Sequence, residues 1–115
     1  MILILSRDLI FCSRFHAAAE AARIPSQTAL SAEQASTAMQ SGEVAGLFID
    51  LETPDLDLPA IVSRAREAQD DCLIVAYGPH VHEARLQAAR DAGCDQVLSR
   101  GQFDRELPAL LQSIC

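Results

Sequence analysis

The chain has 115 residues, half of them hydrophobic, and a formal net charge of −7. This length and composition predict one folded domain over residues 1–115, and the nine positive charges, all arginines, form none of the basic clusters that nucleic-acid binding needs. No apolar stretch reaches the roughly 18 residues of a membrane span and the N-terminus lacks the basic flank of a signal peptide, so we expect a cytoplasmic protein without nucleic-acid or membrane partners.

Apolar runs and amphipathic segments alternate along the chain. Ile2–Leu5 is a short continuous apolar run, which is typical of a strand buried on both faces. A helix is expected from Asp8 to Ala22, because Ile10, Phe11 and several alanines give this segment an apolar side. Pro25 ends the helix. The later predicted elements follow the same alternation: strand Ser26–Leu30, helix Ser31–Gln40, strand Val44–Ile49, helix Leu58–Ala68, strand Cys72–Ala76, helix Val81–Ala92, strand Gln96–Leu98 and helix Phe103–Ile114.

Polar residues and a glycine mark several helix ends. Ser31 is a predicted N-cap, with Gln34 three residues later as in a capping box. Asp57 is placed to cap the third predicted helix, and Gly93 to end the fourth. These positions support the element boundaries independently of the hydrophobic pattern.

The order of the elements predicts the fold. Continuous apolar strands separated by amphipathic helices favour parallel pairing with helices on both faces of the sheet, and right-handed crossovers leave few topologies. We therefore expect an α/β fold, a flavodoxin-like doubly wound five-stranded parallel sheet of order 2-1-3-4-5. In this fold the loops after Leu5, Ile49 and Ala76 border one cleft at the carboxyl edge of the sheet.

Asp50 directly follows the apolar run Leu47–Ile49, so its carboxylate is predicted to lie at the edge where such sheets bind ligands. Glu52, Asp55 and Asp57 follow in the same loop. They could form a cation site, or they could be solvated loop residues with Asp57 acting only as a helix cap.

The cysteines and histidines form no complete metal-binding pattern. The four cysteines contain no C-x-x-C pair, so we expect reduced and mostly buried thiols. Cys12 and His16 lie one helical turn apart, but two ligands do not make a zinc site. His80 and His82 could be exposed at the start of the fourth helix, or form a pH-sensitive or protein-contact surface. We predict no metal ion and no other cofactor from these residues.

Over nearly its whole length the chain resembles the CheY-like receiver domain of two-component response regulators. The resemblance rests on the order of the elements, on Ile49-Asp50-Leu51 followed by Pro54 and Asp57, and on Ala92-Gly93-Cys94-Asp95 before the last strand. It implies that Asp50 is at the phosphoacceptor position, where a carboxylate attacks a phosphoryl group and Mg²⁺ offsets the oxygen charge. It also implies a protein partner: a histidine kinase, an output protein or a second copy of the chain.

Several positions depart from the receiver pattern. Receivers carry a pair of acids after the first strand that helps to hold Mg²⁺, whereas this chain has Ser6-Arg7, with Asp8 one position late. Tyr77 replaces the Thr or Ser that grips the phosphoryl group, and Arg100 replaces the Lys of the fifth strand. Because a guanidinium next to the site opposes a cation, we expect Mg²⁺ binding to be lost.

The two arginines suggest a replacement for that chemistry. A guanidinium can form two parallel hydrogen bonds with a carboxylate, so one hypothesis is that Arg7, Arg100 or both lock Asp50 in a permanent ion pair. The alternative is that Arg7 points into solvent.

Three classes of function follow. We expect a stand-alone, degenerate pseudo-receiver that regulates other proteins by binding them and is not an enzyme. The second possibility is a working phosphoacceptor, phosphorylated on Asp50 with Mg²⁺ in a phosphorelay. The third is a small enzyme or ligand-binding protein using the cleft, although the sequence contains no G-x-G-x-x-G, P-loop or nucleophile elbow.

Overall fold

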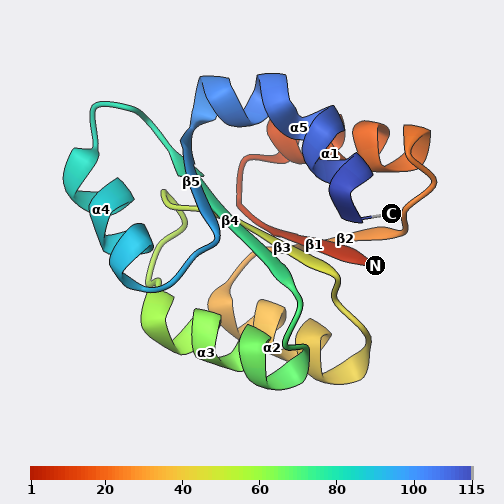
Figure 1. Ribbon diagram of the computed structural model, residues 1–115, viewed down its shortest axis with the longest axis horizontal. Helices are drawn as coiled ribbons and strands as arrows, with labels where there is room; N and C mark the ends of the chain where they lie inside the picture. The colour runs from red at the N-terminus through yellow and green to blue at the C-terminus, as the bar shows by residue number, and fades with distance from the viewer. Residues whose placement is uncertain (115) are drawn as a thin grey trace.

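The computed structural model describes residues 1–114. Its centre is a sheet of five parallel strands in the order β2-β1-β3-β4-β5 (Figure 1), so the predicted flavodoxin-like topology is confirmed. The elements in chain order are β1 Ile2–Leu5, α1 Leu9–Ala21, β2 Ser26–Ala29, α2 Ala32–Ser41, β3 Gly46–Asp50, α3 Leu58–Ala68, β4 Leu73–Gly78, α4 Glu83–Asp91, β5 Gln96–Ser99 and α5 Arg100–Ile114.

The sheet separates two hydrophobic cores. Successive side chains of a strand point to opposite faces, so Leu3 and Leu5 of β1 pack with α2, α3 and α4. Ile2 and Ile4 face the other way and pack with α1 and α5, as the layers in Figure 1 show. A continuous apolar run fits this arrangement because both faces of the strand are covered.

The predicted caps lie at the helix ends. The Ser31 side chain accepts a hydrogen bond from the backbone N–H of Gln34 at 3.2 Å. The Asp57 carboxylate accepts one from the N–H of Ala60 at 3.2 Å and begins α3. Gly93 follows α4 with a φ of +96°, a left-handed conformation that only glycine adopts at little cost. All three predicted cap positions are therefore confirmed.

Helix α5 begins at Arg100, earlier than the predicted start at Phe103. The cause is a second capping box, which the hydrophobic pattern did not indicate. The Ser99 hydroxyl accepts from the N–H of Gln102 at 3.2 Å, and the Gln102 side-chain oxygen accepts from the N–H of Ser99 at 2.9 Å.

Helix α4 begins at Glu83, later than the predicted start at Val81. A turn intervenes, in which the N–H of His82 donates to the carbonyl of Pro79 at 3.0 Å. Strand β4 extends to Gly78 because its last residues pair with β5. Across residues 1–114, no helix combines the length and the hydrophobicity that crossing a bilayer requires.

Candidate functional site

Asp50 is the last residue of β3 and lies at the carboxyl edge of the sheet, between β1 and β4. Leu5, Ile49 and Ala76 are aligned in the strand register, so the loops that follow these strands leave the sheet at one edge, as predicted. The exposed fraction of Asp50 is 8%. The carboxylate is therefore almost removed from water, and its polar contacts decide what it can do.

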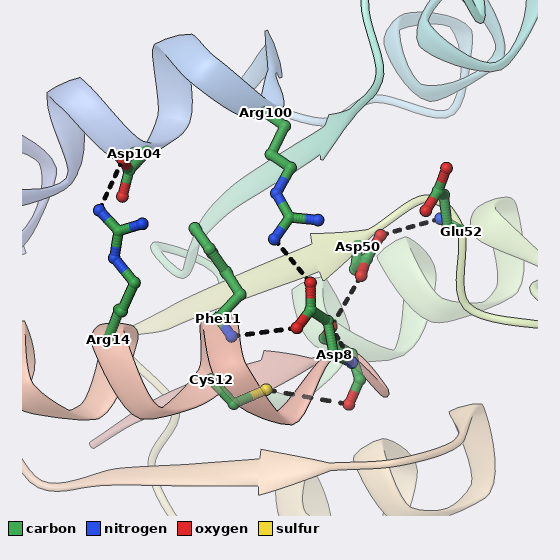
Figure 2. Close-up of polar contacts among 9 residues, drawn as sticks. Asp8, Phe11, Cys12, Arg14, Asp50, Glu52, Arg100 and Asp104 are labelled. Carbon is green, nitrogen blue, oxygen red and sulfur yellow. Dashed lines mark hydrogen bonds and ion pairs between the residues drawn. The ribbon is translucent and has the colours of Figure 1, made fainter.

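Both carboxylate oxygens of Asp50 accept hydrogen bonds from the chain itself. The fully buried Ser6 hydroxyl donates to Oδ2 at 2.7 Å. The backbone N–H of Glu52 donates to Oδ1 at 3.0 Å (Figure 2). The Ser6 oxygen accepts in turn from the N–H of Asp8 at 3.1 Å. Hydrogen bonds to an ionised carboxylate are stronger than neutral ones, so these protein groups fix the orientation of Asp50.

Asp8 and Arg100 form an ion pair between α1 and α5. Arg100 Nη2 lies 2.6 Å from Asp8 Oδ2, and Asp8 Oδ1 accepts from the N–H of Phe11 at 3.1 Å, which caps α1 (Figure 2). The Phe11 hydrogen bond first, and the Arg100 hydrogen bond second, hold the pKa of Asp8 below its ordinary value. The guanidinium also lies 5.0 Å from the centroid of the Phe11 ring. Both oxygens of Asp8 are thus engaged within the protein.

The predicted ion pair between Asp50 and an arginine is wrong. Arg100 binds Asp8 instead, because that carboxylate stands at the start of α1, within reach of the start of α5. Arg7 turns toward the end of β2, where its Nε donates to the carbonyl of Leu30 at 2.9 Å, and its side chain is exposed. Asp50 is held by a hydroxyl and a backbone N–H rather than by a guanidinium.

Tyr77 lies beside Asp50 in the strand register, but it belongs to the core. Only 1% of it is exposed, and its ring stacks on Phe103 at 4.4 Å and contacts Phe11 at 5.4 Å between centroids. Within residues 1–114 its hydroxyl has no hydrogen-bond partner. Burial first, and the charge of Asp50 second, raise the pKa of this hydroxyl. Tyr77 therefore stays neutral and is part of the hydrophobic core next to Asp50.

Cys12 and His16 are not brought together as a metal site. The Cys12 thiol lies 4.0 Å from the carbonyl oxygen of Ser6, whereas the two ring nitrogens of His16 bond to the hydroxyls of Ser26 and Thr28 at 2.6 and 2.5 Å. In the part of the chain that the structure describes, no three His, Cys, Asp or Glu side chains gather as a metal-binding group.

The remaining candidates lie around the site without joining it. Glu52 and Asp55 are exposed in the β3–α3 loop, while Asp57 caps α3, as one of the two interpretations of this acidic loop requires. His80 is exposed, as one interpretation expected, but His82 is half-buried, and within residues 1–114 its buried Nδ1 has no hydrogen-bond partner.

Sequence reasoning missed Thr53. Its exposed fraction is 6%, its N–H donates to the carbonyl of Asp50 at 3.0 Å, and its hydroxyl donates to the carbonyl of Leu5 at 3.3 Å. Thr53 thus ties the β3–α3 loop to β1. A threonine in a polar loop carries no signal that separates this role from simple exposure.

Comparison with known proteins identifies the fold. No protein-family model and no curated protein sequence matches the chain. Solved structures do match: the receiver domain of the sensor histidine kinase PA1611 from Pseudomonas aeruginosa, with a magnesium ion in its active site cleft, is 17% identical with a TM-score of 0.80, covering 97% of this chain and 93% of that one.

Two further receivers are equally similar in shape. The receiver domain of NtrX from Brucella abortus is 15% identical, covers 99% and 97% of the two chains and gives a TM-score of 0.82. The chemotaxis response regulator CheY4 of Vibrio cholerae is 15% identical, with the same coverage and a TM-score of 0.81. The chain therefore has the fold of response-regulator receiver domains.

Proposed function

We propose that the protein is a pseudo-receiver, a regulatory module of two-component-type signalling that works by binding other proteins without Mg²⁺-dependent phosphorylation. The observation that carries this proposal is the state of Asp50. Each of its carboxylate oxygens accepts a hydrogen bond from the chain, one from Ser6 and one from the backbone N–H of Glu52, and the neighbouring carboxylate of Asp8 is paired with Arg100. The acceptor position is present, but the groups around it differ from those of a phosphorylation site.

The available oxygen donors do not fit Mg²⁺. This ion takes octahedral oxygen ligands and usually one or two carboxylates. Of the carboxylates near the site, Asp50 is nearly buried, Glu52 and Asp55 are exposed in the loop, and withdrawing Asp8 from Arg100 would break its ion pair. Ser6 offers a hydroxyl at one of the two positions where a receiver has an acid, and Arg7, at the other, turns away to the carbonyl of Leu30. We therefore derive no step through a magnesium ion.

The partner in this proposal is another protein: a histidine kinase, an output protein or a second copy of the chain. The receiver fold supports this choice because the similar domain of PA1611 is part of a sensor histidine kinase. Such a module binds and regulates without catalysing a reaction of its own. A cytoplasmic location remains a prediction from the sequence.

A second candidate function is phosphorylation of Asp50 in a phosphorelay. The position of Asp50 favours it, since the carboxylate lies at the carboxyl edge of β3 and is not wholly sealed from solvent. In this case the Ser6 hydrogen bond would have to break or move before the carboxylate attacked a phosphoryl group.

Intact mass spectrometry after incubation with acetyl phosphate and Mg²⁺ separates the two functions. We expect no phosphoryl adduct on the wild type under conditions that label an ordinary receiver. Asp50→Asn is the control, and its spectrum should match that of the wild type, with no phosphoryl adduct on either protein. An adduct on the wild type that disappears in Asp50→Asn would overturn the pseudo-receiver proposal in favour of the phosphorelay.

A further inference from the structure

Helices α3 and α4 lie on the face of the sheet opposite α1 and α5 (Figure 1). A groove lies between these two helices. Its volume is about 940 Å³. The β3–α3 loop contributes apolar side chains, among them Leu51 and Leu56, and the two helices form the walls. The groove thus begins in the loop that follows Asp50 and continues away from it between the helices.

Helix α3 is connected to the segment that follows α4. Arg66 near the end of α3 forms an ion pair with Asp95, just beyond α4, at 2.8 Å. The same guanidinium donates to the carbonyl of Gly93 at 3.3 Å, so the end of α3 is connected to the end of α4. The walls carry small side chains, Pro59 and Ser63 on α3 and Ala88 on α4. Because small side chains leave space between the helices, larger side chains of another molecule could fill it.

The charges around the groove are unbalanced. Glu52, Asp57 and Asp91 line it, against Arg85 as the only cation among its lining residues. Within residues 1–114 neither Glu52 nor Arg85 takes part in an ion pair. An apolar surface with an acidic margin is complementary to a segment that is apolar on one side and basic on the other.

We propose that this groove docks a basic amphipathic segment of a partner protein. Apolar side chains of that segment would pack on Leu56, Pro59 and Ala88, which line the groove and are not buried. Basic side chains would approach Glu52 and Asp91. The inference rests on the proposed function as a protein-binding module and adds the binding surface and the chemistry of the partner. The Glu52 N–H bonds to Asp50, so the occupant would touch the loop that holds the carboxylate.

An NMR titration of the ¹⁵N-labelled full chain tests this proposal, with a synthetic amphipathic helical peptide of leucine and lysine as the probe. We expect chemical-shift changes concentrated in the β3–α3 loop, α3 and α4. The same peptide with glutamate in place of lysine should bind at least about tenfold more weakly, because the acidic margin repels it. Added salt should weaken the binding of the lysine peptide.

Matched variants locate the binding site. Ala88→Gln, which fills the groove from an exposed helical position, should weaken the lysine peptide about tenfold, whereas Ala17→Gln on α1 should leave its affinity unchanged. The double variant Glu52→Gln/Asp91→Asn should weaken it roughly three- to tenfold. Spectra of the free variants establish that each remains folded.

Shift changes spread over the whole acidic surface, or equal affinities for wild type and Ala88→Gln, would overturn the proposal. Equal binding of the glutamate peptide would do so too. The labelling of Asp50 by acetyl phosphate is a separate readout. If the peptide does not bind the groove, the docking proposal is wrong and the pseudo-receiver proposal still stands. If Asp50 is phosphorylated, the pseudo-receiver proposal is wrong, and the peptide titration still decides the docking proposal.

Discussion

Ser6 connects the polar groups at the carboxyl edge of the sheet. Its hydroxyl has one proton, which goes to Asp50, and its oxygen accepts from the N–H of Asp8. Because Ser6 is completely buried, water cannot easily replace either contact. One small side chain thereby links the end of β3 to the start of α1.

We expect Ser6→Ala to lower the free energy of unfolding by about 1.5 to 3 kcal/mol, since a nearly buried carboxylate loses a hydrogen-bond donor. Urea unfolding followed by circular dichroism measures the change. Ser13→Ala, at an exposed position of α1, should stay within about 0.5 kcal/mol of the wild type. If both variants were equally stable, the Ser6–Asp50 bond would contribute nothing.

Asp8 makes the stability depend on pH. The hydrogen bonds from Phe11 and Arg100 hold its pKa in the folded state below the ordinary value, so the charged form stabilises the fold above the unfolded pKa. That contribution is lost as the pH falls through the lower, folded pKa. Asp8→Asn keeps a good N-cap residue and removes the charge.

We therefore expect the wild type to exceed Asp8→Asn in urea midpoint at about pH 6, and the gap to close as the pH falls below about 4. The other carboxyl groups titrate in both proteins, so subtracting the two urea midpoints at each pH leaves the contribution of Asp8. A gap that stayed constant down to acid pH would show that the Asp8 charge contributes no stability.

At the scale of single elements, the helix ends depend on a few residues outside the hydrophobic pattern. Gly93 and Cys94 complete the end of α4, donating to the carbonyls of Arg90 at 3.1 Å and Ala89 at 3.3 Å. Helix α1 ends in the same way, except that Arg23 takes the left-handed position with a φ of 60°. A glycine at this position predicts such a helix end from the sequence, whereas an arginine gives no such signal.

Gly93→Ala should lower the free energy of unfolding by about 1 kcal/mol, because alanine at positive φ is strained although its Cβ would meet only Val62 at 3.8 Å. Gly101→Ala, in the first turn of α5, should instead be neutral or stabilising by up to about 1 kcal/mol. Thermal melts of the two variants provide the comparison. If Gly93→Ala melted no lower than Gly101→Ala, the left-handed backbone conformation of Gly93 would not be the cause of the expected loss of stability.

At the scale of the whole molecule, the two cores share one sheet. Phe11, Phe48, Tyr77 and Phe103 form an aromatic group between the sheet and the α1 and α5 layer. The opposite face is mainly aliphatic. Since adjacent residues of β1, β3 and β4 belong to different cores, neither core can unfold without disturbing the strands of the other.

We expect one cooperative unfolding transition. The chain has one tyrosine and no tryptophan, so Tyr77 fluorescence reports on the aromatic core alone, while circular dichroism reports on all helices and strands. Both signals should change together in urea. Phe103→Ala should lower the urea midpoint of both signals, because it lowers the free energy of unfolding by about 3 to 5 kcal/mol. Separate midpoints for the two signals would contradict a single unit.

Much of this architecture could be predicted from local residue patterns. The apolar runs of β1, β3 and β4 require burial on both faces, and that requirement selects a parallel sheet with helices on both sides. Ser31, Asp57 and Gly93 mark helix ends by short-range chemistry, which a sequence displays directly. The position of Asp50 at the carboxyl edge follows from the same reasoning, because it depends only on where β3 ends.

The partners of the charged residues were decided by the tertiary structure. The sequence left open whether an arginine binds Asp50 or Arg7 is exposed; in the structure Arg100 binds Asp8, and Arg7 is exposed and donates to a backbone carbonyl. Which carboxylate a guanidinium reaches depends on how α1 and α5 lie across the sheet, and these segments are distant in the chain. The Ser6–Asp50 bond and the groove between α3 and α4 arise in the same way, since each joins residues that only the packed fold brings together.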